Sequence, residues 1–314
     1  MTIPDFNNIS LAHSRIQHVI HKTPVLSSQL INEYTGTTLF FKCENFQKVG
    51  AFKFRGASNA VLSLSNEEAE NGVATHSSGN HAAALALAAK NRGISAYIVM
   101  PENAPEVKKK AVAGYGTEIF YCKPTLQARE EGLKKVVEKT GASFIHPYDN
   151  ELIIAGQGTA AKEFLEEIPQ LDIIIAPVGG GGLLSGTSIA AKSMKPEIIV
   201  IAAEPKGADD AYRSFISGKL IPSINPNTIC DGLLTSLSEL TFSVIQKNVD
   251  EIITVTEDSI IKAMELIWTR LKIIVEPSSS VCLAAVLENK QRFYSKKTGI
   301  IISGGNVELS KLPF

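Results

Sequence analysis

The chain has 314 residues, of which 44% are hydrophobic, so it can bury the cores of about two domains. Its 31 Lys and Arg residues against 32 Asp and Glu give a net charge of −1, which excludes a general electrostatic attraction to nucleic acid or to an anionic membrane. No apolar run reaches the roughly 18 residues of a membrane helix, and the N-terminus lacks a signal-peptide pattern. The four cysteines are scattered and form no C-x-x-C pair, so we expect a cytoplasmic enzyme.

Short apolar runs alternate with helical patterns along most of the chain. The predicted strands are Leu39–Cys43, Gly72–Thr75, Ala96–Met100, Glu118–Cys122, Ser143–His146, Leu171–Ala176, Ile198–Ala203, Ile252–Val255 and Gly299–Ser303. The predicted helices are Arg55–Leu64, Asn80–Lys90, Glu106–Tyr115, Leu126–Thr140, Ala155–Glu167, Gly182–Lys192, Asp258–Lys272 and Ser278–Glu288. Strands of about five residues without strict alternation are typical of parallel sheets that are buried on both faces. The alternation with helices predicts an α/β fold.

Four consecutive glycines, Gly179, Gly180, Gly181 and Gly182, follow the strand that ends near Ala176 and begin a helix. Without Cβ atoms, their backbone N–H groups can face one anion, and the helix adds its positive dipole end. The run predicts a phosphate site. A P-loop is excluded because Thr187 stands where its lysine is required, and a dinucleotide fingerprint fails because Ser185 replaces the last glycine. A tight turn without a ligand is the alternative.

Lys53 lies between Phe52 and Phe54, and a lysine in apolar surroundings has a lowered pKa and a nucleophilic neutral amine. The alternative is a surface lysine whose stem covers apolar neighbours. A reactive lysine together with a phosphate site is what pyridoxal 5'-phosphate requires.

Two further loops follow predicted strands and could meet the glycines at the carboxyl ends of the sheets. Ser77–His81 precedes an alanine-rich helix, where free backbone N–H groups suit a carboxylate; ordinary capping by Ser78 or Asn80 is the alternative. Ser303 begins a Ser-Gly-Gly-Asn turn and could form a hydrogen bond with a ring nitrogen; the alternative is a glycine turn that binds no ligand. Glu204, Asp209 and Asp210 share a short loop that suits a hard cation or is simply solvated.

In order along nearly the whole chain, these motifs resemble the serine racemase and threonine dehydratase group of fold-type II pyridoxal-phosphate enzymes. The resemblance is carried by Phe41–Ala57, Ser77–His81, Ala155–Thr159, the four glycines, Glu204–Asp210, Met264–Pro277 and Ser303–Val307. It implies the tryptophan-synthase-β fold, with two doubly wound α/β domains and the active site between them. The large domain is expected to comprise residues 1–72 and 149–314, and a small mobile domain residues 73–148.

The resemblance also implies the role of each site residue. Lys53 would hold the cofactor as a Schiff base and act as a base on one substrate face, while Ser78 would serve the opposite face. The other cofactor residues would be Phe52, Asn80, Gly179, Gly180, Gly181, Gly182, Leu183 and Ser303. The substrate residues would be Ser77, Ser78, Asn80, His81 and Arg129, although Arg129 could also be an ordinary helix-surface residue. Glu204, the carbonyl of Ala208 and Asp210 resemble ligands of Mg²⁺, Ca²⁺ or Mn²⁺.

The activity implied is that of a serine racemase which also dehydrates L-serine. Ser78 favours this activity, because many threonine dehydratases resemble Ser-Ala-Gly-Asn-His at this loop. L-Threonine dehydratase and threo-3-hydroxyaspartate dehydratase are the alternatives within the class. A non-catalytic amino-acid sensor and a nicotinamide oxidoreductase are the alternatives outside it. The expected partners are a small amino-acid substrate and a second copy of the chain in a homodimer, with neither nucleic acid nor membrane.

Overall fold

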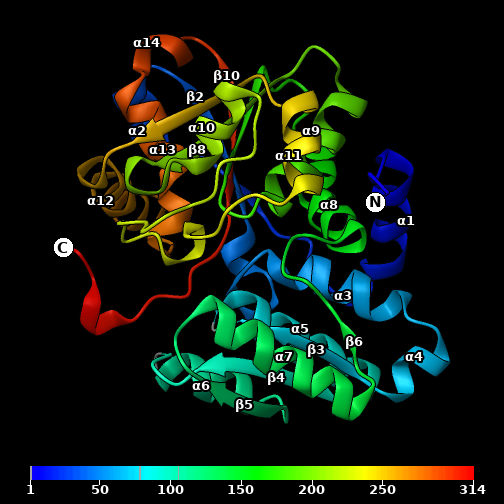
Figure 1. Cartoon of the computed structure of the whole chain (residues 1–314). Coiled ribbons are helices and arrows are strands. Elements are labelled where there is room, and N and C mark those ends of the chain that lie inside the picture. The colour runs from blue at the N-terminus through cyan, green and yellow to red at the C-terminus, as the bar shows by residue number, and fades with distance from the viewer. Residues whose placement is uncertain (1, 78, 105) are drawn as a thin grey trace.

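The computed structural model describes residues 2–77, 79–104 and 106–314 and contains two sheets (Figure 1). The larger sheet has six strands in the order β1-β2-β10-β7-β8-β9, and only the pair β1–β2 is antiparallel. The smaller sheet is parallel and has the order β5-β4-β3-β6. The strands are β1 Val25–Leu26, β2 Thr38–Cys43, β3 Val73–His76, β4 Ala96–Pro101, β5 Glu118–Cys122, β6 Ser143–Phe144, β7 Ile173–Pro177, β8 Ile199–Pro205, β9 Glu251–Val255 and β10 Lys297–Ile302.

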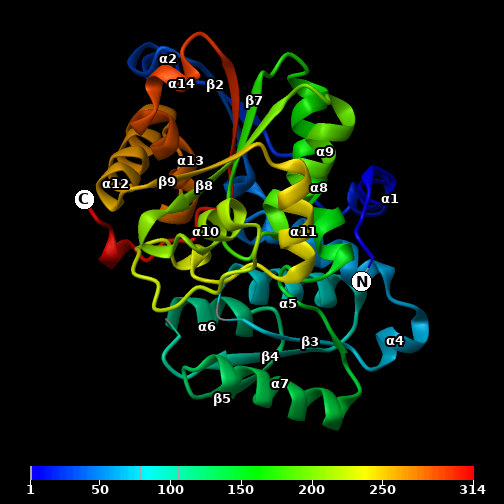
Figure 2. The ribbon, with the colours of Figure 1, turned by 45° about the horizontal axis from the view of Figure 1, so that its top comes forward.

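Helices cover both faces of the six-stranded sheet (Figure 2). Ile174 and Ala176 of β7 face one hydrophobic core, while Ile173 and Ile175 face the other, as expected for a strand buried on both sides. The first core is covered by α1 Phe6–Ile16, α8 Glu151–Glu167, α9 Gly182–Met194, α10 Asp210–Ser217 and α11 Glu239–Asn248. The second is covered by α2 Gln29–Thr35, α12 Glu257–Leu266, α13 Pro277–Glu288 and α14 Lys290–Phe293.

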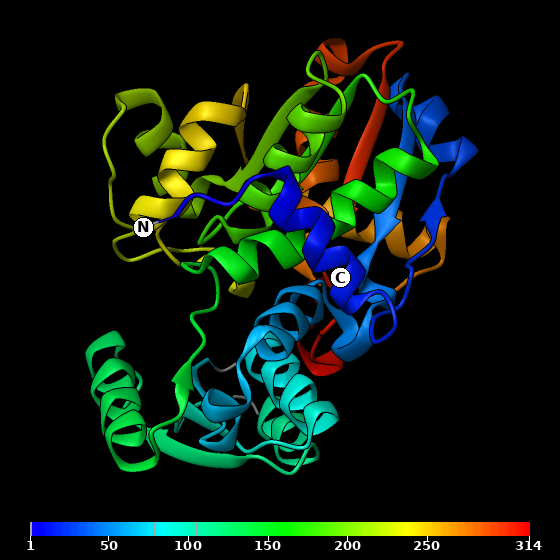
Figure 3. The same ribbon diagram turned by 90° about the vertical axis from the view of Figure 1, so that its right-hand side faces the viewer.

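The four-stranded sheet is covered in the same way by helices on both faces. Val73, Ile98 and Met100 pack in one core with α3 Lys53–Ser63, α5 Asn80–Arg92 and α6 Glu106–Ala113. Ala74 and Val99 pack in the other core with α7 Leu126–Thr140. The chain returns from this sheet to α8 through a single segment, residues 145–150, which is visible between the two units (Figure 3).

The α/β fold with two doubly wound units is therefore as predicted, and β5 and α7 have the predicted bounds. Several elements were not predicted: β1, α1, α2, α4 Asn66–Glu70, α10, α11 and α14. The predicted helix Asp258–Lys272 is wrong in one respect, because α12 passes into a π-helical turn, Ile267–Leu271. The domain boundaries at 72/73 and 148/149, and the mobility of the smaller unit, stay predictions. No helix in the described ranges is long and apolar enough to cross a membrane.

Candidate active site

Lys53 lies at the start of α3, next to the end of β10. The Phe52 N–H donates a hydrogen bond to the Ser303 carbonyl oxygen at 2.9 Å, and Ala51 forms an isolated bridge with Gly304. The Lys53 ammonium donates to the Pro147 carbonyl oxygen at 2.9 Å and lies 5.1 Å from the centre of the Phe52 ring. Burial lowers the pKa of Lys53 to about 8, and the Glu276 carboxylate opposes this shift. The lowered lysine pKa predicted from the flanking phenylalanines is thus confirmed.

The four glycines form a tight, buried turn between β7 and α9. Gly181 has a φ of +87°, which a side chain would strain, and it caps α9 with no side-chain hydrogen bond. A Cβ on Gly180 would lie 2.3 Å from the Tyr148 ring, so only glycine permits this close approach. The first N–H groups of α9 and the missing Cβ atoms leave a backbone cradle of the kind that binds phosphate. Leu183 lies in the first turn of α9 and is 4% exposed.

Ser303 follows β10, the strand that is hydrogen-bonded to both β2 and β7. Because β7 leads into the glycines, the two loops meet at the same edge of the larger sheet, as the sequence predicted. The Ser303 hydroxyl lies 2.9 Å from the Ser279 hydroxyl, which in turn donates to the Gly304 carbonyl oxygen at 2.6 Å. Ser279 therefore fixes the position of Ser303.

The loop after β3 brings a second unit of the chain to this site. Asn80, the first residue of α5, donates to both carboxylate oxygens of Glu276, at 3.1 and 3.2 Å, and accepts from Asn306 at 2.9 Å. It does not cap α5, so the capping alternative is wrong for this residue. His81 is 2% exposed, and its Nε2 lies 3.2 Å from the Ile145 carbonyl oxygen. Ser77 is half-buried, and Ser78 lies outside the described residues.

Aromatic and basic side chains gather where β6 leads to α8. His146 and Tyr148 are in edge contact, with ring centres 4.6 Å apart, and His76 lies 6.2 Å from His146. The Nε atom of Arg129 is buried and has no hydrogen-bond partner among the described residues. Burial lowers the pKa of His76, and the positive charge of Arg129 lowers it further, so the two side chains are close.

The two main carboxylates of the predicted acidic loop lie at the end of β8 and the start of α10 and are buried, so the alternative of a solvated loop is wrong for them. Glu204 and Asp210 are each 1% exposed. Glu204 accepts hydrogen bonds from the N–H groups of Ala211 and Tyr212 at 2.9 and 2.8 Å, and burial raises its pKa to about 8. Burial also raises the pKa of Asp210 to about 6, and its Oδ2 has no partner among the described residues.

The buried carboxylates of Glu204 and Asp210 and the backbone carbonyl of Ala208 belong to one short segment and are all oxygen donors, the ligand type that fits a hard cation. Within the described ranges, no three His, Cys, Asp or Glu side chains are grouped to hold a metal. A cation here would therefore depend on backbone oxygen atoms as well as on Glu204 and Asp210.

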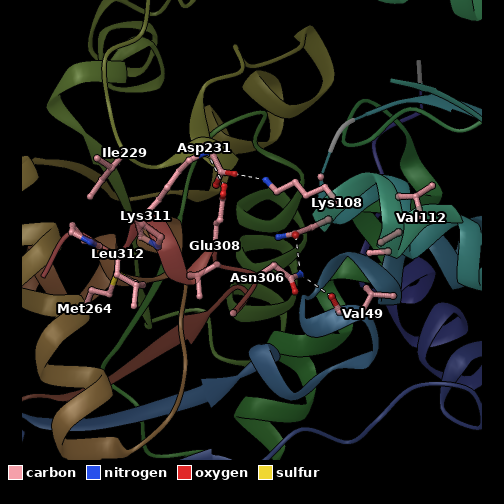
Figure 4. Close-up of a pocket in the computed structure, with 18 of the residues that line it drawn as sticks. Val49, Lys108, Val112, Ile229, Asp231, Met264, Asn306, Glu308, Lys311 and Leu312 are labelled. Carbon is pink, nitrogen blue, oxygen red and sulfur yellow. Dashed lines mark hydrogen bonds and ion pairs between the residues drawn. The ribbon is translucent and has the colours of Figure 1, made fainter. Parts of the chain in front are cut away.

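A cavity of about 540 Å³ borders the site between the two units (Figure 4). Asn80 and Asn306 line it, and Lys108 of α6 forms an ion pair with Asp231 of the larger unit at its wall. The cavity thus has walls from both units, and two cross-unit contacts lie at its edge.

Sequence reasoning gave no role to Glu276, Pro147 or Tyr148. Glu276 is 4% exposed, and Asn80 and Asn306 bond its carboxylate. Pro147 contacts Lys53, and Tyr148 packs on the glycine turn. The sequence marked Glu276 only as part of a motif, and residues 147 and 148 only as the end of the predicted small domain, after the predicted strand Ser143–His146. Their partners are distant in the chain, so no local pattern identified them.

The site brings together a half-buried lysine of lowered pKa and a glycine turn whose helix start has no side-chain cap. The chain belongs to the family of pyridoxal-phosphate dependent enzymes, whose model matches residues 16–304. A serine racemase of Dictyostelium discoideum is 55% identical over 99% of this chain and 98% of that protein. A beta-hydroxyaspartate dehydratase of Paracoccus denitrificans is 50% identical over the full length of both chains. The solved structure of maize serine racemase superposes with a TM-score of 0.97, at 49% identity, over 99% of this chain and 96% of that one.

Proposed function

We propose that the protein is a serine racemase that also dehydrates L-serine, using pyridoxal 5'-phosphate bound at Lys53. The observation that carries this proposal is the position of Lys53, half-buried beside the turn from β10 and hydrogen-bonded to the segment that packs on the four glycines. The similarity to serine racemases along the whole chain supports the choice of reaction.

The residues present fit the cofactor. The backbone of Gly179, Gly180, Gly181 and Gly182, with Leu183, would hold its phosphate; Ser303, positioned by Ser279, would face its ring nitrogen; and Phe52 and Asn80 would lie against its ring. When bound, the cofactor withdraws electrons from the substrate Cα and makes the Cα proton acidic. A neutral serine hydroxyl at the ring nitrogen would limit this withdrawal.

The remaining chemistry belongs to side chains of this protein. The neutral amine of Lys53 takes the Cα proton on one face of the substrate, which its lowered pKa allows near neutral pH. Ser77, Asn80 and His81 orient the substrate carboxylate. Ser78 would return a proton to the opposite face and so invert the centre. Without that return, the β-hydroxyl takes up a proton and leaves as water, and a second water molecule hydrolyses the released enamine, through its imine form, to a keto acid and ammonia.

Replacing Ser78 with alanine tests this division of labour. We expect the Ser78→Ala variant to lose D/L interconversion while it keeps elimination from L-serine. Enantiomers are measured by chiral chromatography and the keto acid by its reduction in a coupled assay. Equal loss of both activities would contradict the assignment of two faces.

A divalent cation, Mg²⁺ or else Ca²⁺ or Mn²⁺, belongs to the proposal. It would bind Glu204, Asp210 and the Ala208 carbonyl. The unpartnered Oδ2 of Asp210 and the raised pKa values of both carboxyls support this, because a cation would relieve the cost of burying two negative charges. We also propose a homodimer in the cytoplasm; the four cysteines are free, in keeping with a reducing compartment.

Dehydration of threo-3-hydroxyaspartate is the second candidate, and Arg129 favours it. A buried guanidinium Nε without an acceptor suits a second substrate carboxylate better than the side chain of serine. The beta-hydroxyaspartate dehydratase relative supports this reading, and L-threonine dehydratase is a further alternative. A panel of L-serine, D-serine, L-threonine and threo-3-hydroxyaspartate, with kcat/KM measured for each, decides among them. A non-catalytic sensor would be favoured if none of these amino acids is turned over and if the protein lacks the visible Schiff-base absorbance that borohydride removes.

A further inference from the structure

Glu276 is a buried acid that the proposed reaction leaves without a role. It precedes α13, where Pro277 occupies the first helical position, and its side chain is 4% exposed. The charged and titratable groups that influence Glu276 or are influenced by it are Lys53 of α3, Asp231, Lys108 of α6 and Cys230. A buried carboxylate is costly unless it is well bonded, so its partners indicate what it does.

Those partners come from both units of the molecule. From the smaller unit, the Asn80 amide donates to both carboxylate oxygens. From the larger unit, the Asn306 N–H donates to Oε2 at 3.1 Å. The Asn306 side chain then donates to the Asn80 Oδ1 at 2.9 Å and to the Val49 carbonyl oxygen at 2.8 Å. Glu276, Asn80, Asn306 and Val49 form one network, here called the Glu276 network.

The network lies at the start of the helix that follows the proposed substrate loop. Asn80 is the first residue of α5, so the bonds to Glu276 fix where Ser77, Asn80 and His81 stand relative to Lys53. Val49 lies four residues before Lys53 on the segment that leads into α3. Both sides of the proposed site are therefore tied to the same carboxylate.

We propose that Glu276 is a positioning residue that holds the substrate loop of the smaller unit against the Lys53 segment, and that it acts through Asn80. Only the expected effect of Glu276 on enzyme kinetics rests on the proposed function; its structural role does not. Glu276 accepts at both carboxylate oxygens from the Asn80 amide. Glu276→Gln replaces one of these acceptors with a donor that faces the Asn80 amide, and Asn80→Asp removes the donor. The double variant restores a donor–acceptor pair in the opposite direction.

The experiment compares Glu276→Gln, Asn80→Asp and the double variant, with Glu308→Gln as the matched control. Glu308 is a glutamate at the edge of the same cavity, and its partners among the described residues, Ser310 and Lys311, are local. Hydrogen exchange, read by mass spectrometry on the cofactor-loaded proteins, is followed in residues 79–92 and 304–308. We expect each single variant to exchange at least fivefold faster there. In the double variant, the new amide at position 276 donates to the new carboxylate at position 80, and we expect protection to return to within twofold of the original.

Unchanged exchange in Glu276→Gln, or a double variant as unprotected as the singles, would overturn the proposal. If Glu276→Gln does not fold, recovery of folding in the double variant reports the same pairing, and failure to recover refutes it. The Glu308→Gln variant is expected to match the original protein; equal loosening there would also refute a specific role.

Kinetics supply a second measurement. We expect Glu276→Gln to raise KM for the amino acid about tenfold and to lower kcat less than threefold, because the substrate loop is displaced while Lys53 is retained. A fall in kcat with unchanged KM would contradict a positioning role. If the original protein turns over no amino acid, the proposed function fails, while the exchange measurement still decides the role of Glu276.

Discussion

Lys53 and Pro147, which are 94 residues apart, are joined by a hydrogen bond from the lysine Nζ to the proline carbonyl oxygen at 2.9 Å. Pro147 lies in the segment that returns the chain from the four-stranded sheet to α8. The next residue, Tyr148, packs against Gly180 and Gly182. One short connection thus contacts both the proposed reactive amine and the proposed phosphate cradle. A movement of the smaller unit would therefore shift the contacts of both the amine and the cradle.

The pKa of Lys53 makes the attachment of the cofactor depend on pH. Burial lowers this pKa to about 8, so Nζ is protonated below pH 8 and neutral above it. Only the neutral amine attacks an aldehyde. For cofactor-free protein we expect the rate of attachment, followed by absorbance, to rise about tenfold per pH unit up to about pH 8 and then to level off.

The control for this pH dependence is Nα-acetyl-lysine reacting with the free cofactor, whose rate should keep rising to roughly pH 10. A protein profile that follows the free amine would show that the pKa of Lys53 is not lowered. Replacement of Lys53 by alanine should abolish the covalent absorbance altogether.

Gly181 and Gly93 form a matched pair for testing the phosphate cradle. Both have a positive φ, +87° and +74°, so an alanine strains each backbone by about 1 kcal/mol. A Cβ at position 181 would also lie 2.8 Å from side-chain atoms of Leu237 and Thr241, whereas at position 93 it meets nothing within 4 Å. We expect both variants to lose some thermal stability, but only Gly181→Ala to lose affinity for the cofactor, by at least tenfold. Equal affinities in a fluorescence titration would contradict the cradle.

The sequence was sufficient to predict most of the parallel sheets, because buried strands have a strong apolar signal. It also placed Gly179–Gly182 and Ser303 at one edge, since both follow strands and parallel strands end together. It missed α1, although Ile9, Ala12 and Ile16 have helical spacing behind an Asp5 capping box. The sequence pattern of α1 is therefore sufficient to predict a helix.

The rest of the site depends on contacts that no local pattern contains. Asn80 and Glu276 are 196 residues apart, and although the sequence predicted Asn80 as a site residue, nothing in either segment indicates that the two side chains are bonded. The acidic loop was recognised, but its burial depends on α10 and on backbone N–H groups that bond Glu204. Composition alone indicates that such a loop is solvated, because carboxylates are rarely buried without partners.

Removal of divalent cations tests the acidic loop. If a cation binds Glu204 and Asp210, treatment with EDTA followed by dialysis should lower the thermal midpoint by several degrees, and added Mg²⁺ or Ca²⁺ should restore it. Glu204→Gln should abolish the response to the cation. Asp209→Asn is the control, because Asp209 is partly exposed and pairs with Arg213. A midpoint that EDTA leaves unchanged, in protein whose metal content has been measured before and after, would count against the cation.

A buried ion network fixes the helix that carries Lys53 and gives the last prediction. Arg55 is fully buried and bonds the carboxylates of Glu44 and Glu163 at 2.7–2.9 Å, and Lys42 donates to Glu163 at 2.8 Å. Although burial opposes it, the hydrogen bonds from Arg55 and Lys42 hold the pKa of Glu163 below its usual value. A lowered folded-state pKa means that this stabilisation is present above the unfolded-state value and is lost as the pH falls through the folded-state value.

Glu163→Gln leaves two buried cations facing one full carboxylate, a change that costs about 3–5 kcal/mol. We expect the urea midpoint at pH 7 to fall by about 1 M or more. Glu166→Gln on the same helix is the control, because Glu166 is half exposed and, among the described residues, forms an ion pair with Lys162 alone; its midpoint should stay within about 0.2 M. The difference between the variants should shrink as the pH falls through the lowered folded-state pKa of Glu163, since protonation then removes the same charge from the original protein. A constant difference down to pH 3 would mean that packing, not charge, sets the cost.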